Sequence, residues 1–181
     1  MARTATWIIV IVLCVAMAAG VFLGGPPPSR TSGGAKGADG AVSPVVTPLT
    51  ADAKARHTKM RKVVANLLTK AGGDPSKLSS ADSKLAAVQT IVDAADPATR
   101  SDWELRCMAI VFSDALVQGQ KLEWVSVRDA EGRREALTAR GSQLMLFPLD
   151  IFVRQAKSPN PINTKAFYDA INAELTKAKT N

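Results

Sequence analysis

The chain has 181 residues, of which 46% are apolar and 22% are charged, and its net charge is +7 at neutral pH. This balance excludes a disordered polypeptide, and the length leaves room for one domain with short extensions. Two cysteines and a single histidine are too few for a disulfide scaffold or for most transition-metal sites. The composition therefore excludes most metalloenzymes and a small disulfide-rich protein.

An uncharged segment, residues 4–29, contains an apolar run from Trp7 to Leu23. About 20 apolar residues cross a hydrocarbon core as a helix, and Trp7 stands where an interfacial aromatic residue is expected. We therefore predict a single-pass transmembrane anchor over residues 1–23. The alternative is a signal peptide cleaved after about residue 18, because Ala16-Met17-Ala18 resembles a peptidase site. The apolar run continues past that site, however, and is longer than the core of a typical signal peptide.

The composition changes sharply in residues 24–50, which hold 6 of the 12 glycines and 5 of the 10 prolines of the chain. Such a segment buries too little apolar surface to offset the entropy of ordering, so we predict a disordered linker. Arg3 precedes the apolar run, whereas the first basic residue after it is Arg30. The positive-inside bias therefore favours a cytoplasmic N-terminus and a globular domain on the periplasmic or extracellular side.

The predicted globular domain, residues 51–181, begins with helices. Apolar residues at helical spacing predict an amphipathic helix over 51–71, which Gly72-Gly73 ends. A second helix is expected from Ser80, a good N-cap, to the residue before Asp96-Pro97. A third is expected from Pro97 to Gln118. Its middle is apolar on most sides, which is typical of a helix buried between layers.

The pattern then changes to strands joined by turns. Asp129 to Gly132 has the composition of a hairpin turn between β-branched and aromatic stretches. Three strands are expected, at residues 122–128, 133–139 and 142–147. Two further helices are expected at 148–153 and, capped by Asn163, at 164–177. This order predicts an α+β domain in which helices pack on a three-stranded antiparallel meander.

The excess of positive charge is concentrated in the helix expected at residues 51–71, which has six basic residues against Asp52. Four of these are candidate contacts to an anionic lipid surface or to an acidic partner: Lys54, Lys59, Arg61 and Lys62. Each contributes roughly 1 kcal/mol close to a charged bilayer. An ordinary solvated helix face gives the same pattern. A nucleic-acid surface is not expected, because no aromatic residues alternate with the basic ones.

No catalytic set emerges from the reactive residues. His57 falls at the edge of an apolar stripe, as a packing histidine does, and Cys107 lies in the most apolar helix, where a thiol is inert. Trp124 is expected in the core or, if exposed on the sheet, as a binding anchor. The enzymatic alternative is a hydrolase that acts through carboxylates and a serine or Cys107. It predicts a polar pocket near Trp124 and Asp129.

A series of short motifs follows in fixed order between Trp103 and Phe167. They are Trp103-x-Leu105-Arg106-Cys107-Met108, Phe112-Ser113-Asp114-Ala115-Leu116, Leu122-Glu123-Trp124-Val125-x-Val127-x-Asp129-x-x-Gly132, Ala136-Leu137, and Leu144-x-Leu146-Phe147-Pro148 with Arg154. In order and spacing they resemble a bacterial family known as domain of unknown function 3806. In that family glycine often follows the phenylalanine, where this chain has Ser113. The resemblance implies an α+β fold and assigns no catalytic residue.

The anchor, the linker and the lack of a catalytic set together predict a membrane-tethered, non-catalytic interaction module that contacts another protein of the cell envelope. The two alternatives are an enzyme with an unrecognised site and a peripheral binder of anionic lipid that acts through the helix at residues 51–71. The membrane is the expected partner of the N-terminal segment. No metal, cofactor or nucleic acid is expected to bind.

Overall fold

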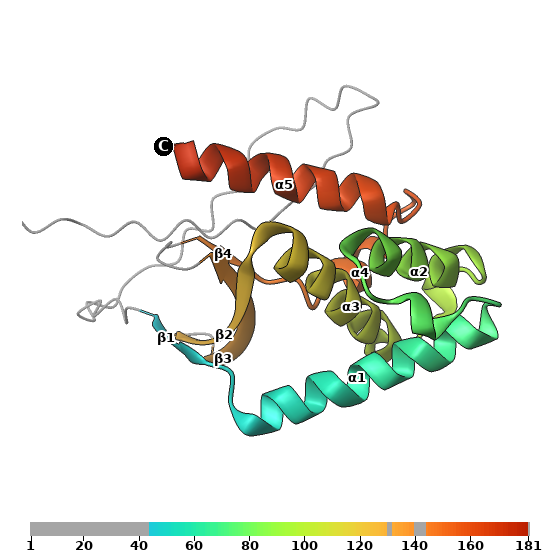
Figure 1. Ribbon diagram of the computed structural model, residues 1–181, viewed down its shortest axis with the longest axis horizontal. Helices are drawn as coiled ribbons and strands as arrows, with labels where there is room; N and C mark the ends of the chain where they lie inside the picture. The colour runs from blue at the N-terminus through green and yellow to red at the C-terminus, as the bar shows by residue number, and fades with distance from the viewer. Residues whose placement is uncertain (1–43, 130–131, 140–143, 181) are drawn as a thin grey trace, which may run out of the picture.

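The computed structural model describes residues 44–129, 132–139 and 144–180. They form an α+β domain in which an antiparallel sheet packs beside a group of helices (Figure 1), as the sequence predicts. The anchor predicted at residues 1–23 and most of the predicted linker, residues 24–43, lie outside this description. Among the helices within the described ranges, none combines the length and the apolar character needed to cross a membrane.

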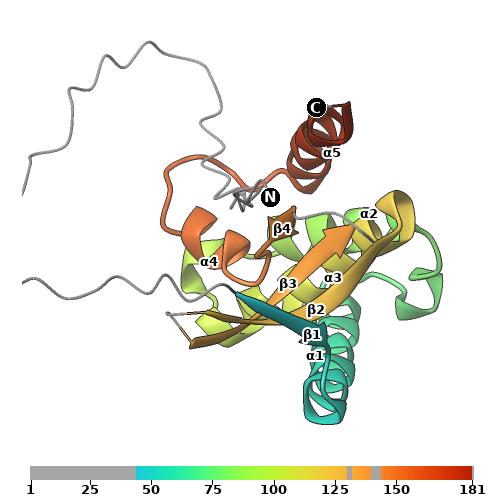
Figure 2. The same ribbon diagram turned by 90° about the vertical axis from the view of Figure 1, so that its left-hand side faces the viewer.

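Within these ranges the sheet has four strands in the order β1-β2-β3-β4, so the prediction of three strands is wrong in number. The additional strand, β1 (Val45–Pro48), comes from the end of the predicted linker and pairs antiparallel with β2 (Leu122–Asp129). β3 (Gly132–Ala139) and β4 (Met145–Leu146) complete the sheet (Figure 2). The Val-Val-Thr run suits a strand, and a proline is tolerated in a strand at the edge of a sheet.

The predicted hairpin joins β2 and β3. Its register pairs Asp129 with Gly132, and Gly132 has a φ of +113°, which favours glycine. The same register pairs Ser126 with Glu135 and Trp124 with Leu137. Because side chains alternate along a strand, these four residues share one face of the sheet. Leu137 belongs to the main core, so this face is the one turned to the helices.

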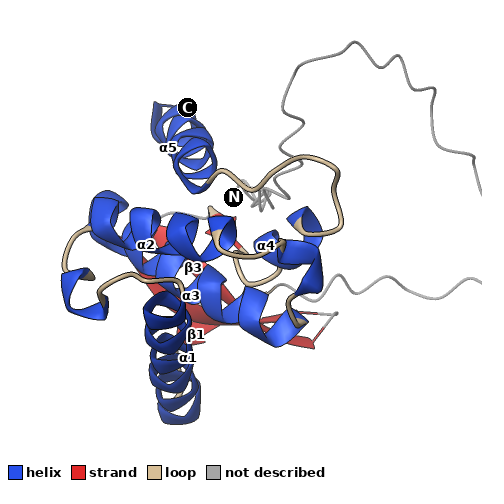
Figure 3. Ribbon diagram, turned by 90° about the vertical axis from the view of Figure 1, so that its right-hand side faces the viewer, coloured by secondary structure: helices blue, strands red, loops and turns tan. Residues whose placement is uncertain are grey.

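The first three helices are α1 (Ala51–Lys70), α2 (Ala81–Asp93) and α3 (Asp102–Gln120). The start of α3 is later than predicted, because Pro97–Thr99 forms a separate 3-10 helix. Ser101 then caps α3, and Glu104 reaches back to the backbone N–H of Ser101 in a capping box. α3 lies between α1 and α2, and the helices cover one face of the sheet (Figure 3).

The last two described helices are α4 (Ile151–Gln155) and α5 (Thr164–Thr180). α4 begins later than predicted, because the backbone N–H of Ile151 donates to the carbonyl of Pro148 and closes a turn first. Asn163 is the N-cap of α5, as predicted, and its side chain accepts from the N–H of Ala166 at 2.9 Å. A further 3-10 helix, Pro75–Lys77, follows α1. The described part of the last predicted strand is limited to β4.

The core is centred on α3, as the apolar character of this helix predicts. Its side chains Cys107, Met108, Ile110, Phe112 and Leu116 are fully buried. The ring of Phe112 meets that of Phe152 edge to face, with 5.5 Å between centroids. A single left-handed residue, Lys121, then connects α3 directly to β2. The core helix therefore fixes where β2 begins.

Candidate functional site

A hollow of about 340 Å³ lies where the first turns of α1 meet β1 and β2. Apolar and basic side chains line it together: Pro48, Leu49, Lys54, His57, Thr58, Arg61 and Trp124. We call this site the α1–β2 hollow. The chain passes from β1 into α1 through only two residues, and Thr50 caps the helix by accepting from the N–H of Ala53 at 3.2 Å. The volume is at the lower end of the range of ligand sites.

A buried acid–base cluster borders the hollow. Nε2 of His57 lies 2.8 Å from Oε2 of Glu135, and Arg56 pairs with the other carboxylate oxygen. The side chains of His57 and Glu135 are almost fully buried, whereas that of Arg56 is half exposed. Burial raises the pKa of Glu135, but the hydrogen bond and charge of His57, together with Arg56, outweigh it and hold the pKa below its ordinary range. Glu135 is therefore an ionised acceptor and not a proton donor.

Trp124 connects this cluster to the hollow. Its ring meets the ring of His57 edge to face, with 4.6 Å between centroids and an interplanar angle of 64°. The indole Nε1 is buried and has no hydrogen-bond partner in the described structure. Trp124 also packs against the main core while it lines the hollow. It is thus a packed aromatic residue that presents one side to the hollow.

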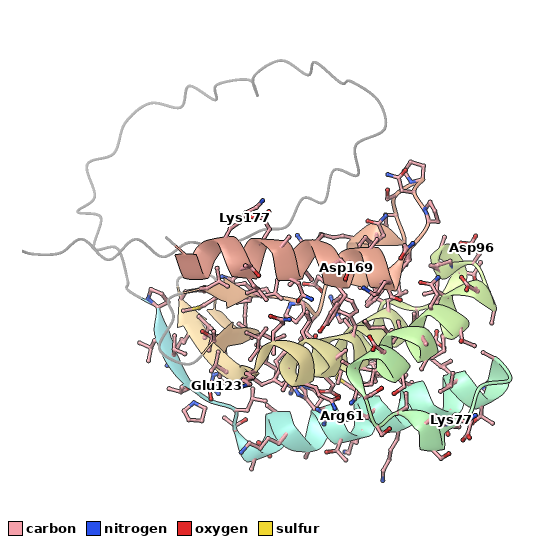
Figure 4. All side chains as sticks on the ribbon, turned by 45° about the horizontal axis from the view of Figure 1, so that its top comes forward. Arg61, Lys77, Asp96, Glu123, Asp169 and Lys177 are labelled. Atoms are coloured by element: carbon pink, nitrogen blue, oxygen red, sulfur yellow. The ribbon has the colours of Figure 1, made fainter. Side chains whose placement is uncertain are left out.

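Arg61 forms the other polar wall of the hollow. Its Nε and Nη2 donate to the two carboxylate oxygens of Asp114 on α3, at 2.7 and 2.8 Å. The hydrogen bonds to Asp114 raise the pKa of Arg61 against the opposing effect of burial. This fork-to-fork pair holds the guanidinium between α1 and α3 (Figure 4). No partner is found for its third nitrogen among the described residues.

The four basic residues singled out in the sequence separate into two groups. Lys54 and Arg61 line the hollow, whereas Lys59 and Lys62 are exposed and lie outside it. The buried residues of α1 define its inner face, and Lys59 and Lys62 occupy the face opposite to it. The structure therefore gives these residues two different environments along one helix.

Sequence reasoning did not identify Glu135 or Asp114 as part of a site. The signal for Glu135 was available, because it lies two residues before the buried Leu137 and so faces the helices on the same side of β3. A glutamate at an inward position of a strand needs a partner. The partner, His57, lies 78 residues earlier in the chain.

The residues proposed for an enzyme occupy unsuitable places. Cys107 is fully buried, and burial, with a smaller effect of Glu104, raises the pKa of its thiol to about 11. Asp129 pairs with Arg134 within the hairpin and does not line the hollow. Among the residues that the structure describes, no group of three His, Cys, Asp or Glu side chains is arranged to hold a metal ion.

The part of the chain from α2 to the start of α5 is similar to a known family. Residues 84–168 match the sequence model described as Domain of unknown function (DUF3806). The resemblance to DUF3806 is confirmed. The matched part contains Trp124, Asp114 and Glu135, whereas β1 and α1 precede it. The α1–β2 hollow thus lies between the part that matches the DUF3806 model and the elements that precede it.

The fold is similar to that of a protein from Bacteroides thetaiotaomicron VPI-5482, whose crystal structure was determined at 1.50 Å resolution. The two chains are 15% identical with a TM-score of 0.59, and the match covers 76% of this chain and 50% of the other. This chain therefore spans about half the length of that protein, and the likeness concerns the fold alone. No curated protein matches the sequence.

Proposed function

We propose that this protein is a non-catalytic interaction module, tethered to a membrane by its N-terminal segment and exposed on the periplasmic or extracellular side, which binds a protein partner through the α1–β2 hollow. The observation that carries this proposal is the composition of the hollow. A packed aromatic residue, Trp124, stands beside Lys54, which has no ion-pair partner among the described side chains. Interfaces are commonly anchored by such an aromatic residue in a pocket.

The polar groups around the hollow are arranged in a way that suits binding of a partner better than proton transfer. Two carboxylates, Glu135 and Asp114, bond side chains that line the hollow, and both are held in ion pairs with basic side chains. The thiol of Cys107 lies in the core and not at the hollow. Groups fixed in ion pairs preserve the shape of a binding surface. A general base would instead need a free lone pair directed at the substrate.

The tether predicts that the full-length protein sediments with membranes and stays there in 1 M salt. An apolar helix inserted in lipid is insensitive to ionic strength, whereas attraction of basic residues to headgroups is screened. Fractionation followed by mass spectrometry of the N-terminus measures this. A variant that lacks residues 1–23 should move to the soluble fraction. Recovery of a soluble mature form that begins near Ala19 would contradict the tether.

The interaction surface predicts site-specific crosslinking in intact cells. A photoreactive amino acid at Thr58, which is exposed and lines the hollow, should yield a discrete protein adduct. The same probe at Asn66, exposed on the same helix but outside the hollow, should yield none. Adducts of equal intensity from both positions, or no adduct from Thr58, would refute the proposed surface. Mass spectrometry of the Thr58 adduct identifies the partner.

A further inference from the structure

The charges around the α1–β2 hollow favour a ligand with one negative charge. Three basic side chains, of Lys54, Arg56 and Arg61, stand with two carboxylates, of Glu135 and Asp114. Arg56 and Arg61 are each paired with a carboxylate, and His57 shares Glu135 with Arg56, so the one positive charge without a carboxylate partner among the described lining residues is that of Lys54. A carboxylate balances this charge. A phosphate monoester, which carries about two negative charges at neutral pH, exceeds it.

The hydrogen-bonding groups of the hollow are mostly donors. The Lys54 ammonium carries three N–H groups, and Arg61 keeps one guanidinium nitrogen beyond its bonds to Asp114. No carboxylate is among the lining residues. These groups are complementary to a ligand rich in acceptors.

Apolar side chains form the rest of the wall. Pro48, Leu49 and the ring of Trp124 face the same space as Lys54 and Arg61. A volume of about 340 Å³ limits the ligand to a small acid or to the last residue of a longer chain. The site therefore suits a compact group with an anionic end and an apolar end.

We infer that the α1–β2 hollow binds a carboxylate monoanion that carries an aliphatic group, with Lys54 and Arg61 on the carboxylate and Leu49, Pro48 and Trp124 on the aliphatic part. This chemistry occurs at the C-terminus of a polypeptide and in small free acids. The inference rests on the proposed function, because it names the chemical group that the partner presents to the hollow.

The test is a titration of the full-length, 15N-labelled chain in detergent micelles with N-acetyl-leucine, followed by the indole N–H signal of Trp124. The Trp124→Phe variant assigns that signal. We expect a saturable shift with N-acetyl-leucine and none with N-acetyl-leucinamide, which has the same shape without the charge. Lys54→Gln should weaken binding about tenfold, the effect of losing one charge-assisted hydrogen bond. Lys70→Gln removes the same charge from an exposed position of α1 outside the hollow and should leave the affinity unchanged.

Equal shifts with the amide, equal weakening by Lys70→Gln, or saturable displacement of N-acetyl-leucine by inorganic phosphate at equal concentration would overturn the inference. A further titration with a longer peptide identifies the source of the carboxylate. Tighter binding of N-acetyl-glycyl-glycyl-leucine than of N-acetyl-leucine assigns the ligand to a polypeptide C-terminus, and equal binding assigns it to a small acid. Crosslinking from Thr58 without carboxylate binding overturns this inference alone. Carboxylate binding without crosslinking overturns the proposed protein partner alone.

Discussion

The Phe112→Ala variant is expected to lower the free energy of unfolding by about 3–5 kcal/mol, the range for truncating a buried aromatic residue in a core. Phe112 is fully buried at the centre of α3, and its ring meets Phe152 of α4 edge to face. Phe152 in turn lies 6.4 Å, between ring centroids, from Phe167 of α5. The truncation therefore leaves a cavity where three helices meet. Urea denaturation followed by far-UV circular dichroism measures the loss.

A matched control on the same helix is Trp103→Ala. Trp103 is 46% exposed, so its truncation should cost much less than that of Phe112. A double-mutant cycle of Phe112→Leu with Phe152→Leu isolates the ring contact, which should contribute about 0.5–1.5 kcal/mol beyond the burial of each ring. Equal losses for Phe112→Ala and Trp103→Ala would show that Phe112 is not at the centre of the core.

The features that sequence alone predicted are those that depend on local pattern. The apolar character of α3 on most sides predicted its burial, and Asn163 predicted the start of α5. The start of α3 was misplaced because Pro97 offered a plausible first turn. The serine and glutamate of a capping box, Ser101 and Glu104, decide it instead. A capping box depends on two residues three positions apart in the chain, so it can be recognised in a sequence without a structure.

The features that sequence missed depend on contacts between distant segments. β1 lies in a stretch whose proline and glycine content indicated a linker, and its pairing with β2, about 80 residues later, stabilises it as a strand. This pairing places Pro48 and the start of α1 beside Trp124, and all of them line the hollow. Lys54 and Lys59 could not be distinguished from their spacing. The difference between them arises because only Lys54 lies on the flank of α1 that meets β2.

The Glu135→Ala variant is expected to lower the free energy of unfolding by about 2–4 kcal/mol. This range lies between the free-energy cost of leaving one buried donor without an acceptor and the larger cost of breaking a fully buried ion pair. Glu135 bonds two residues of α1, of which His57 is buried and Arg56 is half exposed. Removal of the carboxylate leaves Nε2 of His57 without its acceptor, whereas Arg56 regains water. Glu135→Gln keeps an acceptor oxygen for His57 and should cost about half as much.

The control for this position is Glu123→Gln, an exposed glutamate of β2 that should change the stability by no more than about 0.5 kcal/mol. A loss for Glu135→Ala as small as this would show that the carboxylate does not hold α1 to the sheet. Because α1 supplies Lys54 and Arg61 to the hollow, Glu135→Ala should also weaken binding of N-acetyl-leucine, although Glu135 does not line the site.

The pH dependence of the same variants follows from the lowered pKa of Glu135. Burial alone would raise this pKa, and the hydrogen bonds and charges of His57 and Arg56 lower it further than burial raises it. The folded-state value therefore lies below the unfolded value of about 4.3. The stabilising contribution of the carboxylate is complete above the unfolded value and is lost as the pH falls through the folded one. The difference in stability between the wild type and Glu135→Gln should accordingly shrink as the pH falls below about 4.3. A difference that persists unchanged at pH 3 would mean that the negative charge of Glu135 does not hold it to α1.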